Sequence, residues 1–470
     1  MNLSLFNEPE LEFGYGQKLA SPQLGLTYFG PSDLQASSRP LKIHYGVIGV
    51  KDALPALETF IGKIRNHIPS EEKQNIWPMF PGFKAVFNCE LPVKPSAFFE
   101  IKQERLDDIY KIQNAFQRTK EIVDLYMDKL LRIKQLDEKI DVVICLIPDE
   151  IESICRPSAV KSKKMKNDTS YNVDFRRQLK ARSMKENLPI QILRESTLRP
   201  HDEKEFRERG LTPLTDRAWN FSTTLYYKAG GKPWKLSTIR DGVCYIGIGY
   251  VLTDDTYKSK SACCAAQMFL KDGDGVVFKG EEGPWYSPTE KSFHLTEEAA
   301  EKLLRGVVES YQELDGKPLK EIFLHCHSDI DASEYEGFLK ACPKDVKLVI
   351  IKVRIEEGFK LLRDGQYPVR RGTFLKLNEK SCYLWGTGYK ENMKTYDGWE
   401  VPSPMRIEIM YGEAEIDTIA QDILGLTKLN YNSCKLGSSS PVTIGYSKQV
   451  GEILVKNNIK KAQPQFRFYI

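Results

Sequence analysis

The pattern of apolar and polar positions predicts an α/β domain in the first half of the chain. The continuous apolar run at 140–148 is typical of a parallel strand that is buried on both faces. Shorter strand patterns lie at 42–50 and 189–193, and helix patterns lie at 54–67, 106–136 and 174–186. Because strand and helix signals alternate, we expect a doubly wound, Rossmann-like α/β domain, which we place at residues 41–235.

The second half of the chain predicts a different order of elements. Three strands are followed by helix, strand, helix and strand, and the clearest of these patterns lie at 241–251, 263–270, 275–279, 295–314, 321–327 and 346–353. This is the order of a ribonuclease H-like fold, which we expect over residues 236–470. The Gly- and Pro-rich residues 1–40 predict an extended segment with short strands that packs on this second domain.

The composition excludes several classes of protein. With 470 residues, 41% of them hydrophobic and 28% charged, the chain has enough apolar material for two to four domains. No run of about 18 apolar residues predicts a membrane span, and the first residues lack the pattern of a signal peptide. None of the ten cysteines forms a CxxC pair, which favours reduced thiols and a cytoplasmic location.

Positive charge gathers in one segment, although the net charge is only +4. Residues 160–185 hold nine Lys or Arg against two Asp. Such a cluster can bind phosphates, because neutralising the phosphates of a nucleic acid releases condensed counterions. A solvated basic loop is the alternative interpretation.

The end of this segment holds residues that could bind a terminal phosphate. Arg176 and Lys180 are four residues apart and would share one face of a helix. Gln191 follows after the next turn, and Lys228 stands shortly before a Gly-Gly pair. A terminal phosphate needs several donors that converge from different directions, which this set could supply. The same spacing is also common on solvated helices, so the spacing alone leaves both interpretations open.

This stretch resembles the guide-binding motif of Argonaute MID domains, above all those of the short prokaryotic Argonautes. In that motif an aromatic residue and a His or Arg are followed by a Lys four residues on, a Gln after a turn, and a Lys ahead of Gly-Gly. Arg176, Lys180, Gln191 and Lys228 match these places in turn. The likeness covers essentially the whole chain, including Gly25–Pro31, Ile140–Pro148, Leu426–Ser433 and Pro441–Ile444. It implies a MID domain that binds a guide 5′ phosphate, followed by a PIWI domain, without a PAZ domain.

The resemblance also implies a metal ion and partners. In some relatives the motif Gln and the C-terminal carboxylate ligate a divalent cation beside the guide phosphate, which predicts Mg²⁺ at Gln191 and Ile470. The resemblance further implies an RNA guide, a single-stranded DNA target, and a heterodimer with an APAZ-domain effector that carries a TIR, sirtuin-like or nuclease domain. Target recognition would then activate this partner, through NAD depletion or nucleic-acid degradation, as defence against phages and plasmids.

A PIWI domain that cleaves its target needs clustered acids to hold two metal ions. The first acid should lie in the first strand of the domain, where this chain has Gly249, and the second should follow the fourth strand, where it has His327. The last position, near Lys448 and Gln449, carries neither Asp nor His. Because glycine offers no side-chain ligand, we expect no catalytic residues and no slicing by this chain itself.

Two alternatives use residues near these positions. A divergent ribonuclease H-like nuclease could use Asp329 and Asp331 together with a Glu from Glu281–Glu282. A phosphate-binding regulatory protein that carries no guide is the second alternative. The run 325–327, His-Cys-His, also allows a zinc site, because its two histidines share one face of a strand, but no second ligand pair stands at a matching spacing.

Overall fold

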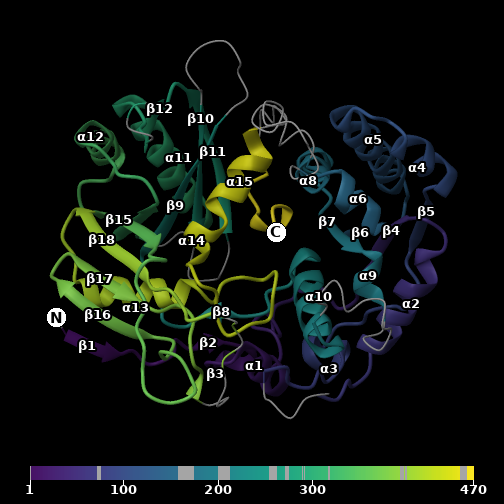
Figure 1. Ribbon diagram of the computed structural model, residues 1–470, viewed down its shortest axis with the longest axis horizontal. Coiled ribbons are helices and arrows are strands. Elements are labelled where there is room, and N and C mark those ends of the chain that lie inside the picture. Colours follow the sequence, from purple (N-terminus) through teal and green to yellow (C-terminus); the bar gives the residue numbers. More distant parts are fainter. Residues whose placement is uncertain are drawn as a thin grey trace.

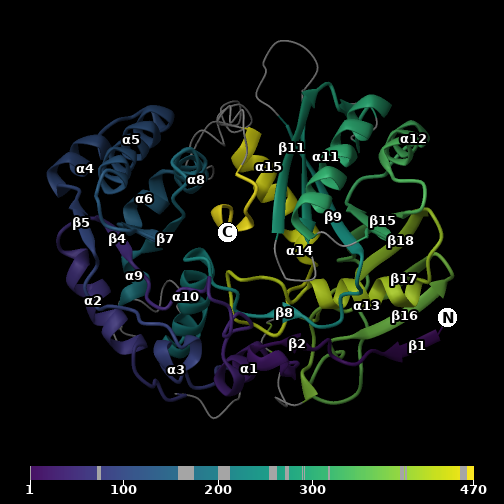
Figure 2. The same ribbon diagram turned by 180° about the vertical axis from the view of Figure 1, so that it is seen from behind.

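Two lobes lie side by side in the computed structural model of the chain (Figures 1 and 2). The structure describes residues 2–70, 76–156, 174–199, 212–252, 262–269, 275–287, 289, 292–315, 318–391, 396, 398, 400–455 and 463–470. Most of the basic segment at 160–185 lies outside these residues, so the patch that it predicts stays a prediction.

A parallel four-stranded sheet forms the core of the first lobe. Its strand order is β5 (Ala97–Glu100), β4 (Tyr45–Gly49), β6 (Val142–Ile147) and β7 (Ile190–Arg194). All six residues of β6 are buried, which explains the uninterrupted apolar run there. The helices of this lobe are α2 (Ala53–Ile64), α3 (Phe83–Phe87), α4 (Gln103–Tyr110), α5 (Ala115–Lys134), α6 (Asp149–Ile154), α8 (Phe175–Met184), α9 (Glu195–Leu198) and α10 (Leu214–Lys228). The predicted doubly wound α/β fold is confirmed.

The single long helix predicted at 106–136 is wrong, because the structure has two helices there, α4 and α5. Asn114 precedes α5, and its side chain accepts a hydrogen bond from the Gln117 amide at 3.0 Å. Such a cap satisfies an amide that has no partner inside the helix, and it therefore favours a new start over continuation. Phe116, near the start of α5, is 42% exposed.

A nine-stranded mixed sheet forms the second lobe. Its order is β1 (Asn2–Leu5), β16 (Thr373–Asn378), β17 (Ser381–Leu384), β18 (Met405–Tyr411), β15 (Lys347–Ile355), β14 (Glu321–Cys326), β9 (Val243–Leu252), β10 (Ala262–Phe269) and β11 (Gly275–Gly283). The five strands from β11 to β15 have the ribonuclease H order, with β14 parallel to both β9 and β15. The predicted fold class is therefore confirmed here too. The extension of this sheet by β18, β17, β16 and β1 was not predicted.

Helices cover the two faces of this sheet unequally. The helices of the lobe are α11 (Glu297–Asp315), α12 (Ala332–Ala341), α13 (Ile416–Leu426), α14 (Val442–Gly445) and α15 (Ser447–Val455), and a short hairpin is formed by β12 (Tyr286–Ser287) and β13 (Ser292–Phe293). One apolar core lies under α11 and α12. The other joins the face under α13 to α15 with the core of the first lobe, so the two lobes share a continuous apolar contact.

The N-terminal segment runs along both lobes. β1 adds an edge strand to the nine-stranded sheet, and β2 (Leu11–Glu12), β3 (Lys18–Leu19) and β8 (Lys235–Leu236) form a small sheet at the junction. A helix, α1 (Pro22–Phe29), replaces the expected extended chain. Ser21 caps this helix by accepting a hydrogen bond from the Leu24 amide, and Pro22 begins it. The stabilisation by this cap outweighs the destabilising effect of the glycine in the middle of the helix.

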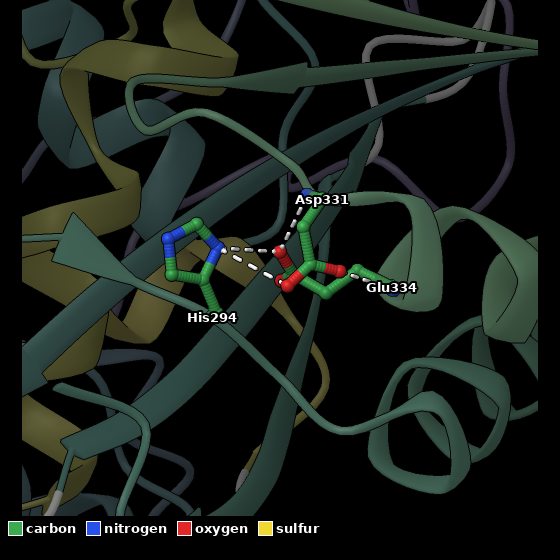
Figure 3. Close-up of side chains that lie close together, drawn as sticks. All are labelled: His294, Asp331 and Glu334. Atoms are coloured by element: carbon green, nitrogen blue, oxygen red, sulfur yellow. Dashed lines mark hydrogen bonds and ion pairs between the residues drawn. The ribbon is translucent and has the colours of Figure 1, made fainter. Parts of the chain in front are cut away.

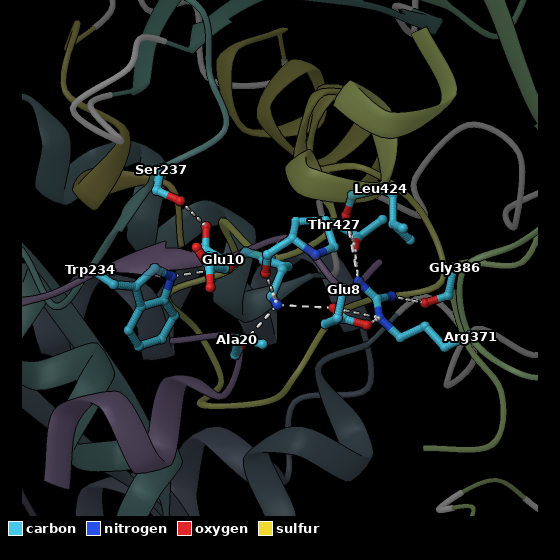
Figure 4. Close-up of polar contacts among 11 residues, drawn as sticks. Glu8, Glu10, Ala20, Trp234, Ser237, Arg371, Gly386, Leu424 and Thr427 are labelled. Atoms are coloured by element: carbon cyan, nitrogen blue, oxygen red, sulfur yellow. Dashed lines mark hydrogen bonds and ion pairs between the residues drawn. The ribbon is translucent and has the colours of Figure 1, made fainter. Parts of the chain in front are cut away.

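Buried charges tie the N-terminal segment to the second lobe (Figure 4). The Lys428 ammonium, whose side chain is fully buried, donates to the Glu8 carboxylate at 2.9 Å and to the carbonyls of Pro9 and Ala20. Arg371, which is also buried, donates to both Glu8 oxygens at 3.0 Å. Burial raises the pKa of Glu8, but the two cations outweigh it and hold that pKa below its usual value. One carboxylate thus pairs with two buried cations at once.

We expect Glu8→Gln to lower the free energy of unfolding by about 3 kcal/mol, because it leaves two buried cations without a counter-charge. Urea denaturation measures the change. Glu379→Gln is the control, since Glu379 is 88% exposed in its ion pair with Lys376 and should contribute at most about 1 kcal/mol. A similar loss in both variants would contradict the argument.

No helix among the described residues is long and apolar enough to cross a membrane. The eight cysteines whose side chains the structure describes are free thiols, and seven of these are buried.

Candidate nucleic-acid interface

Lys180 lies where α8 meets the C-terminal residues of the chain. α8 begins at this place because Asp174 caps it, accepting from the Arg177 amide at 3.1 Å. The ammonium of Lys180 donates to the carbonyl of Tyr469 at 3.1 Å. Burial, and after it the positive charge of Arg176, lowers the pKa of Lys180 to about 8. The lysine is therefore held in surroundings that disfavour its charge.

Lys228 stands at the last position of α10 and is only 1% exposed. Its ammonium donates to the carbonyl of Ile190 at 2.7 Å. Burial, and after it the charge of Lys180, holds the pKa of Lys228 well below its usual value. Among the described residues no carboxylate forms an ion pair with Lys180 or Lys228. The charge of Asp174 offsets the lowering of the Lys180 pKa only in part, so a bound anion would relieve the cost of burying these two neighbouring ammonium groups.

Gln191 follows Ile190 in β7 and offers an unused acceptor. Its amide nitrogen donates to the Ile192 carbonyl at 3.2 Å, while Oε1 is buried with no hydrogen-bond partner in the described part of the chain. Buried polar atoms almost always have a partner, so an unsatisfied one points to a ligand. An amide oxygen is also a ligand that Mg²⁺ accepts, and Ile470, the other predicted ligand, is buried next to Tyr469.

Arg176 occupies a more exposed place than the other three predicted residues. Its Nε pairs with the Glu152 carboxylate at 2.9 Å, and 45% of its side chain is exposed. Its charge nevertheless lowers the pKa of both lysines. The structure therefore brings Lys180 and Lys228 together with Arg176 at the solvent side, and Gln191 follows Ile190, whose carbonyl accepts from Lys228.

The stacked rings of Tyr227 and Tyr431 fix this cluster against the second lobe, with centroids 4.4 Å apart. Thr224 on α10 also donates to the Tyr431 carbonyl at 3.1 Å. Sequence reasoning missed these contacts, and it missed the Tyr469 carbonyl as the partner of Lys180. The aromatic residues near the C-terminus were the only sequence signal for the contact between Lys180 and Tyr469.

The three positions expected to carry metal-binding acids also converge. β9 and β14 pair in parallel up to Ile248 and Cys326, so the next step of the register sets Gly249 level with His327. α15 starts at Ser447 and packs over this point of β9. Gly249, His327 and the start of α15 thus meet where β14 ends beside β9, and none of these residues is an acid.

The backbone around Gly249 leaves no room for a side chain. A Cβ at this position would lie 2.6 Å from the carbonyl carbon of Ser447 and 2.8 Å from its Cβ. Real Cβ atoms do not approach other atoms so closely, so α15 occupies the space that an acid would need. Close packing of this helix on β9 is the physical reason for glycine here.

The alternative acids are not brought together. Asp329 pairs with Lys352 and, at 3.5 Å, with Arg354, and hydrogen bonding to Lys352 lowers its pKa. The side chains of Glu281 and Glu282 lie outside the described residues. Their strand β11 is three places from β14 in the sheet, so the backbones are separated by about 14 Å. This arrangement does not favour a rearranged two-metal centre.

Asp331 belongs to a separate cluster with His294 and Glu334 (Figure 3). Their potential metal-binding atoms lie within 4.8 Å of one another. However, both oxygens of the buried Glu334 already accept hydrogen bonds, from the Leu295 and Asp331 amides at 2.8 and 3.1 Å and from His294 at 2.9 Å. Asp331 and Glu334 form a capping box at the start of α12. The side-chain atoms that could bind a metal are therefore already used in hydrogen bonds, and these bonds hold the start of α12 in place.

The residues of the zinc hypothesis likewise have separate environments. His325 is buried, its Nδ1 is 2.9 Å from the Thr443 hydroxyl, and burial lowers its pKa to about 3. Cys326 faces the opposite side, with its sulfur 3.6 Å from the Ile351 carbonyl. His327 is exposed. The geometry gives no support to a zinc site.

Taken together, a doubly wound domain and a ribonuclease H-like domain define a MID–PIWI fold. The chain has the fold of Argonaute and Piwi proteins. It superimposes on Clostridium butyricum Argonaute bound to a guide DNA and a target DNA with a TM-score of 0.66, at 19% identity, over 97% of this chain and 53% of that one. Aquifex aeolicus Argonaute with externally bound siRNA gives a TM-score of 0.61 at 17% identity, over 99% of this chain and 56% of that one. Drosophila Piwi gives a TM-score of 0.59 at 14% identity, over 100% of this chain and 56% of that one.

Sequence comparison gives the same relation. The Argonaute of Aquifex aeolicus is 22% identical over 239 residues, which is 50% of this chain and 31% of that protein. No family model matches the sequence. The chain spans about half the length of the solved Argonautes, and the sequence match covers less than a third of the curated one. The Argonaute/PIWI resemblance and the fold class expected from the sequence are confirmed, and the length fits a MID–PIWI chain.

Proposed function

We propose that this chain binds a guide nucleic acid by its 5′ phosphate and presents the guide for pairing with a complementary target. The observation that carries the proposal is the pair of neighbouring lysines, Lys180 and Lys228, with lowered pKa values and no acidic partner among the described residues. A phosphate would supply the missing negative charge, and the backbone carbonyls that the lysines now contact would remain secondary partners. Gln191 and Arg176 complete the proposed site.

Comparing guide RNAs that carry a 5′ phosphate or a 5′ hydroxyl tests this function. We expect the phosphorylated guide to bind roughly 10- to 100-fold more tightly, the effect of one or two charge-assisted hydrogen bonds. Lys180→Ala and Gln191→Ala should each reduce this preference, because each removes a group that faces the phosphate. Fluorescence anisotropy titrations with end-labelled guides measure the affinities from which this preference is calculated. Equal affinity for both guides in the wild type and in both variants would sink the proposal.

The preference should depend on pH in a defined direction. Because the pKa of Lys180 is lowered to about 8, its ammonium is charged below pH 8 and loses its proton above. The terminal phosphate gains its second negative charge above about pH 6. We therefore expect the strongest preference between about pH 6 and 8 and a steady loss above pH 8. A preference that stays constant up to pH 10 would show that Lys180 does not contact the phosphate.

The metal and the partners extend this proposal. The free Oε1 of Gln191 fits a Mg²⁺ ligand, and the Ile470 carboxylate is the second proposed ligand. Mg²⁺ would neutralise charge between the phosphate and the carboxylate. Because two lysines lie nearby, we expect the ion to bind only together with the phosphate. Chelation should then weaken binding of a phosphorylated guide and leave that of a hydroxyl guide unchanged.

We further propose that the chain recognises targets without cutting them. Gly249 and His327 stand where metal-binding acids would be needed, and the packing of α15 excludes a side chain at the first position. An RNA guide, a single-stranded DNA target and an APAZ-domain effector partner follow from the resemblance to short prokaryotic Argonautes. Incubation of guide-loaded protein with a matched target and Mg²⁺ or Mn²⁺ should give no cleavage. Site-specific cleavage that persists through repeated purification would favour the divergent nuclease instead.

A further inference from the structure

Residues 463–470 form a compact C-terminal turn that lies between the two lobes (Figure 1). Its backbone joins the second lobe, because the Val277 amide on β11 donates to the Pro464 carbonyl at 2.8 Å. Gln465 also forms an antiparallel β-bridge with Val276. The turn thereby pairs with the start of β11, the last strand of the nine-stranded sheet. The second lobe therefore fixes where this turn lies.

A closed ring of hydrogen bonds connects the C-terminal turn to α8. The Lys180 ammonium donates to the Tyr469 carbonyl at 3.1 Å, and the Tyr469 hydroxyl donates to the Gln463 carbonyl at 2.8 Å. The Gln463 side-chain amide in turn donates to the Met184 carbonyl at 3.1 Å. Met184 lies about one turn of α8 beyond Lys180. The ring therefore closes on the helix that carries the lysine.

The ring holds the Lys180 ammonium in one place without using all of its donors. Tyr469 is 1% exposed, so the carbonyl that accepts from the lysine belongs to a residue packed in the core. A lysine ammonium carries three N–H donors, and among the described residues one of them is used, by Tyr469. The other two are left for a phosphate. Because a lysine side chain loses rotational freedom when it binds, a lysine that is fixed beforehand binds more tightly.

We propose that Tyr469 and Gln463 are positioning residues of the guide 5′-phosphate site, and that they act by fixing the Lys180 ammonium before the guide binds. This inference rests on the proposed function, because it assumes that Lys180 contacts the guide phosphate. Neither positioning residue needs to touch the guide. The second lobe contributes to the site through them, since the turn that orients the lysine is paired with β11.

Tyr469→Phe tests the proposal, because it removes one hydroxyl and keeps the buried ring. We expect the affinity for a 5′-phosphorylated guide RNA to fall about 5-fold, the effect of one lost hydrogen bond, while the affinity for a 5′-hydroxyl guide stays unchanged. Gln463→Met keeps the length of the side chain but loses its donor, so it should act in the same direction. Fluorescence anisotropy measures all four affinities. An equal fall for both guides would show that the ring only stabilises the fold, and would overturn the proposal.

Tyr446→Phe is the matched control for this test. The Tyr446 hydroxyl donates to the Asn430 side chain at 2.6 Å, and its ring packs edge-on against Phe466 of the C-terminal turn, with centroids 5.2 Å apart. The control therefore also loses one tyrosine hydrogen bond next to the turn, but no link to Lys180. Urea denaturation should show a similar loss of stability in both tyrosine variants, whereas the preference for the phosphorylated guide should change in Tyr469→Phe alone.

A double-mutant cycle shows whether Tyr469 acts through Lys180. In a Lys180→Met background the preference for the phosphorylated guide is already reduced, and adding Tyr469→Phe should lower it no further. If Tyr469→Phe has the same effect in both backgrounds, or leaves the preference of the otherwise wild-type protein intact, this inference is overturned. If the wild type itself shows no preference between guides, the proposed function fails, so the two failures are distinguishable.

Discussion

Lys228→Met should abolish the preference for a 5′-phosphorylated guide and leave the protein folded. Methionine has nearly the length of lysine but no charge, so it fills the same buried space at the end of α10. The change removes a buried ammonium that has no counter-charge among the described residues, together with one hydrogen bond to Ile190. We expect a drop from roughly 10- to 100-fold preference to less than about 3-fold.

The free energy of unfolding of this variant should change little, although its preference for the phosphorylated guide is lost. The hydrogen bond to Ile190 contributes about 1 kcal/mol, while burying the charge costs at least as much, so the free energy of unfolding should stay within about 1 kcal/mol of the wild type or rise. Lys185→Met, an exposed lysine just after α8, is the control, and it should change the affinity for both guides equally. A Lys228→Met protein that still prefers the phosphate would remove the central residue of the proposed site.

The second large effect is expected at Gly249. Gly249→Ala should lower the free energy of unfolding by about 3 kcal/mol, because its Cβ would lie 2.6 Å from backbone of α15 and must push that helix off β9. Gly249→Asp should be at least as harmful and should not restore target cleavage. Urea denaturation followed by circular dichroism measures the first effect, and a cleavage assay the second.

Gly306→Ala provides the matched control for this prediction. Gly306 lies within α11, and a Cβ there would meet no atom within 4 Å. The substitution should stabilise the protein by about 0.5–1 kcal/mol, since alanine favours a helix more than glycine does. If Gly249→Ala is tolerated as well as Gly306→Ala, the space beside β9 is open, and the argument against an acid at this position is wrong.

Local sequence was a good guide wherever a segment is buried on both faces. The run at 142–147 predicted β6 because a central parallel strand must be apolar throughout. The sequence was a poor guide where a single polar residue changes the local outcome. Asn114 divides α4 from α5, and Ser21 with Pro22 starts α1, although the hydrophobic pattern runs on through both places.

The candidate site shows the same division. The types and spacing of Arg176, Lys180, Gln191 and Lys228 could be read from the chain, and so could the missing acids at Gly249 and His327. The lowered pKa values of the lysines could not, because they arise from burial and mutual proximity.

By itself, the sequence determined the α/β class, the ribonuclease H order of its second half and the residue types that could bind a phosphate, because periodicity and side-chain chemistry are local properties. The tertiary structure alone decided that two lysines from different helices share one buried place and that α15 fills the space beside Gly249. Burial, electrostatic repulsion and close packing depend on distances between segments far apart in the chain, and only the folded protein sets those distances.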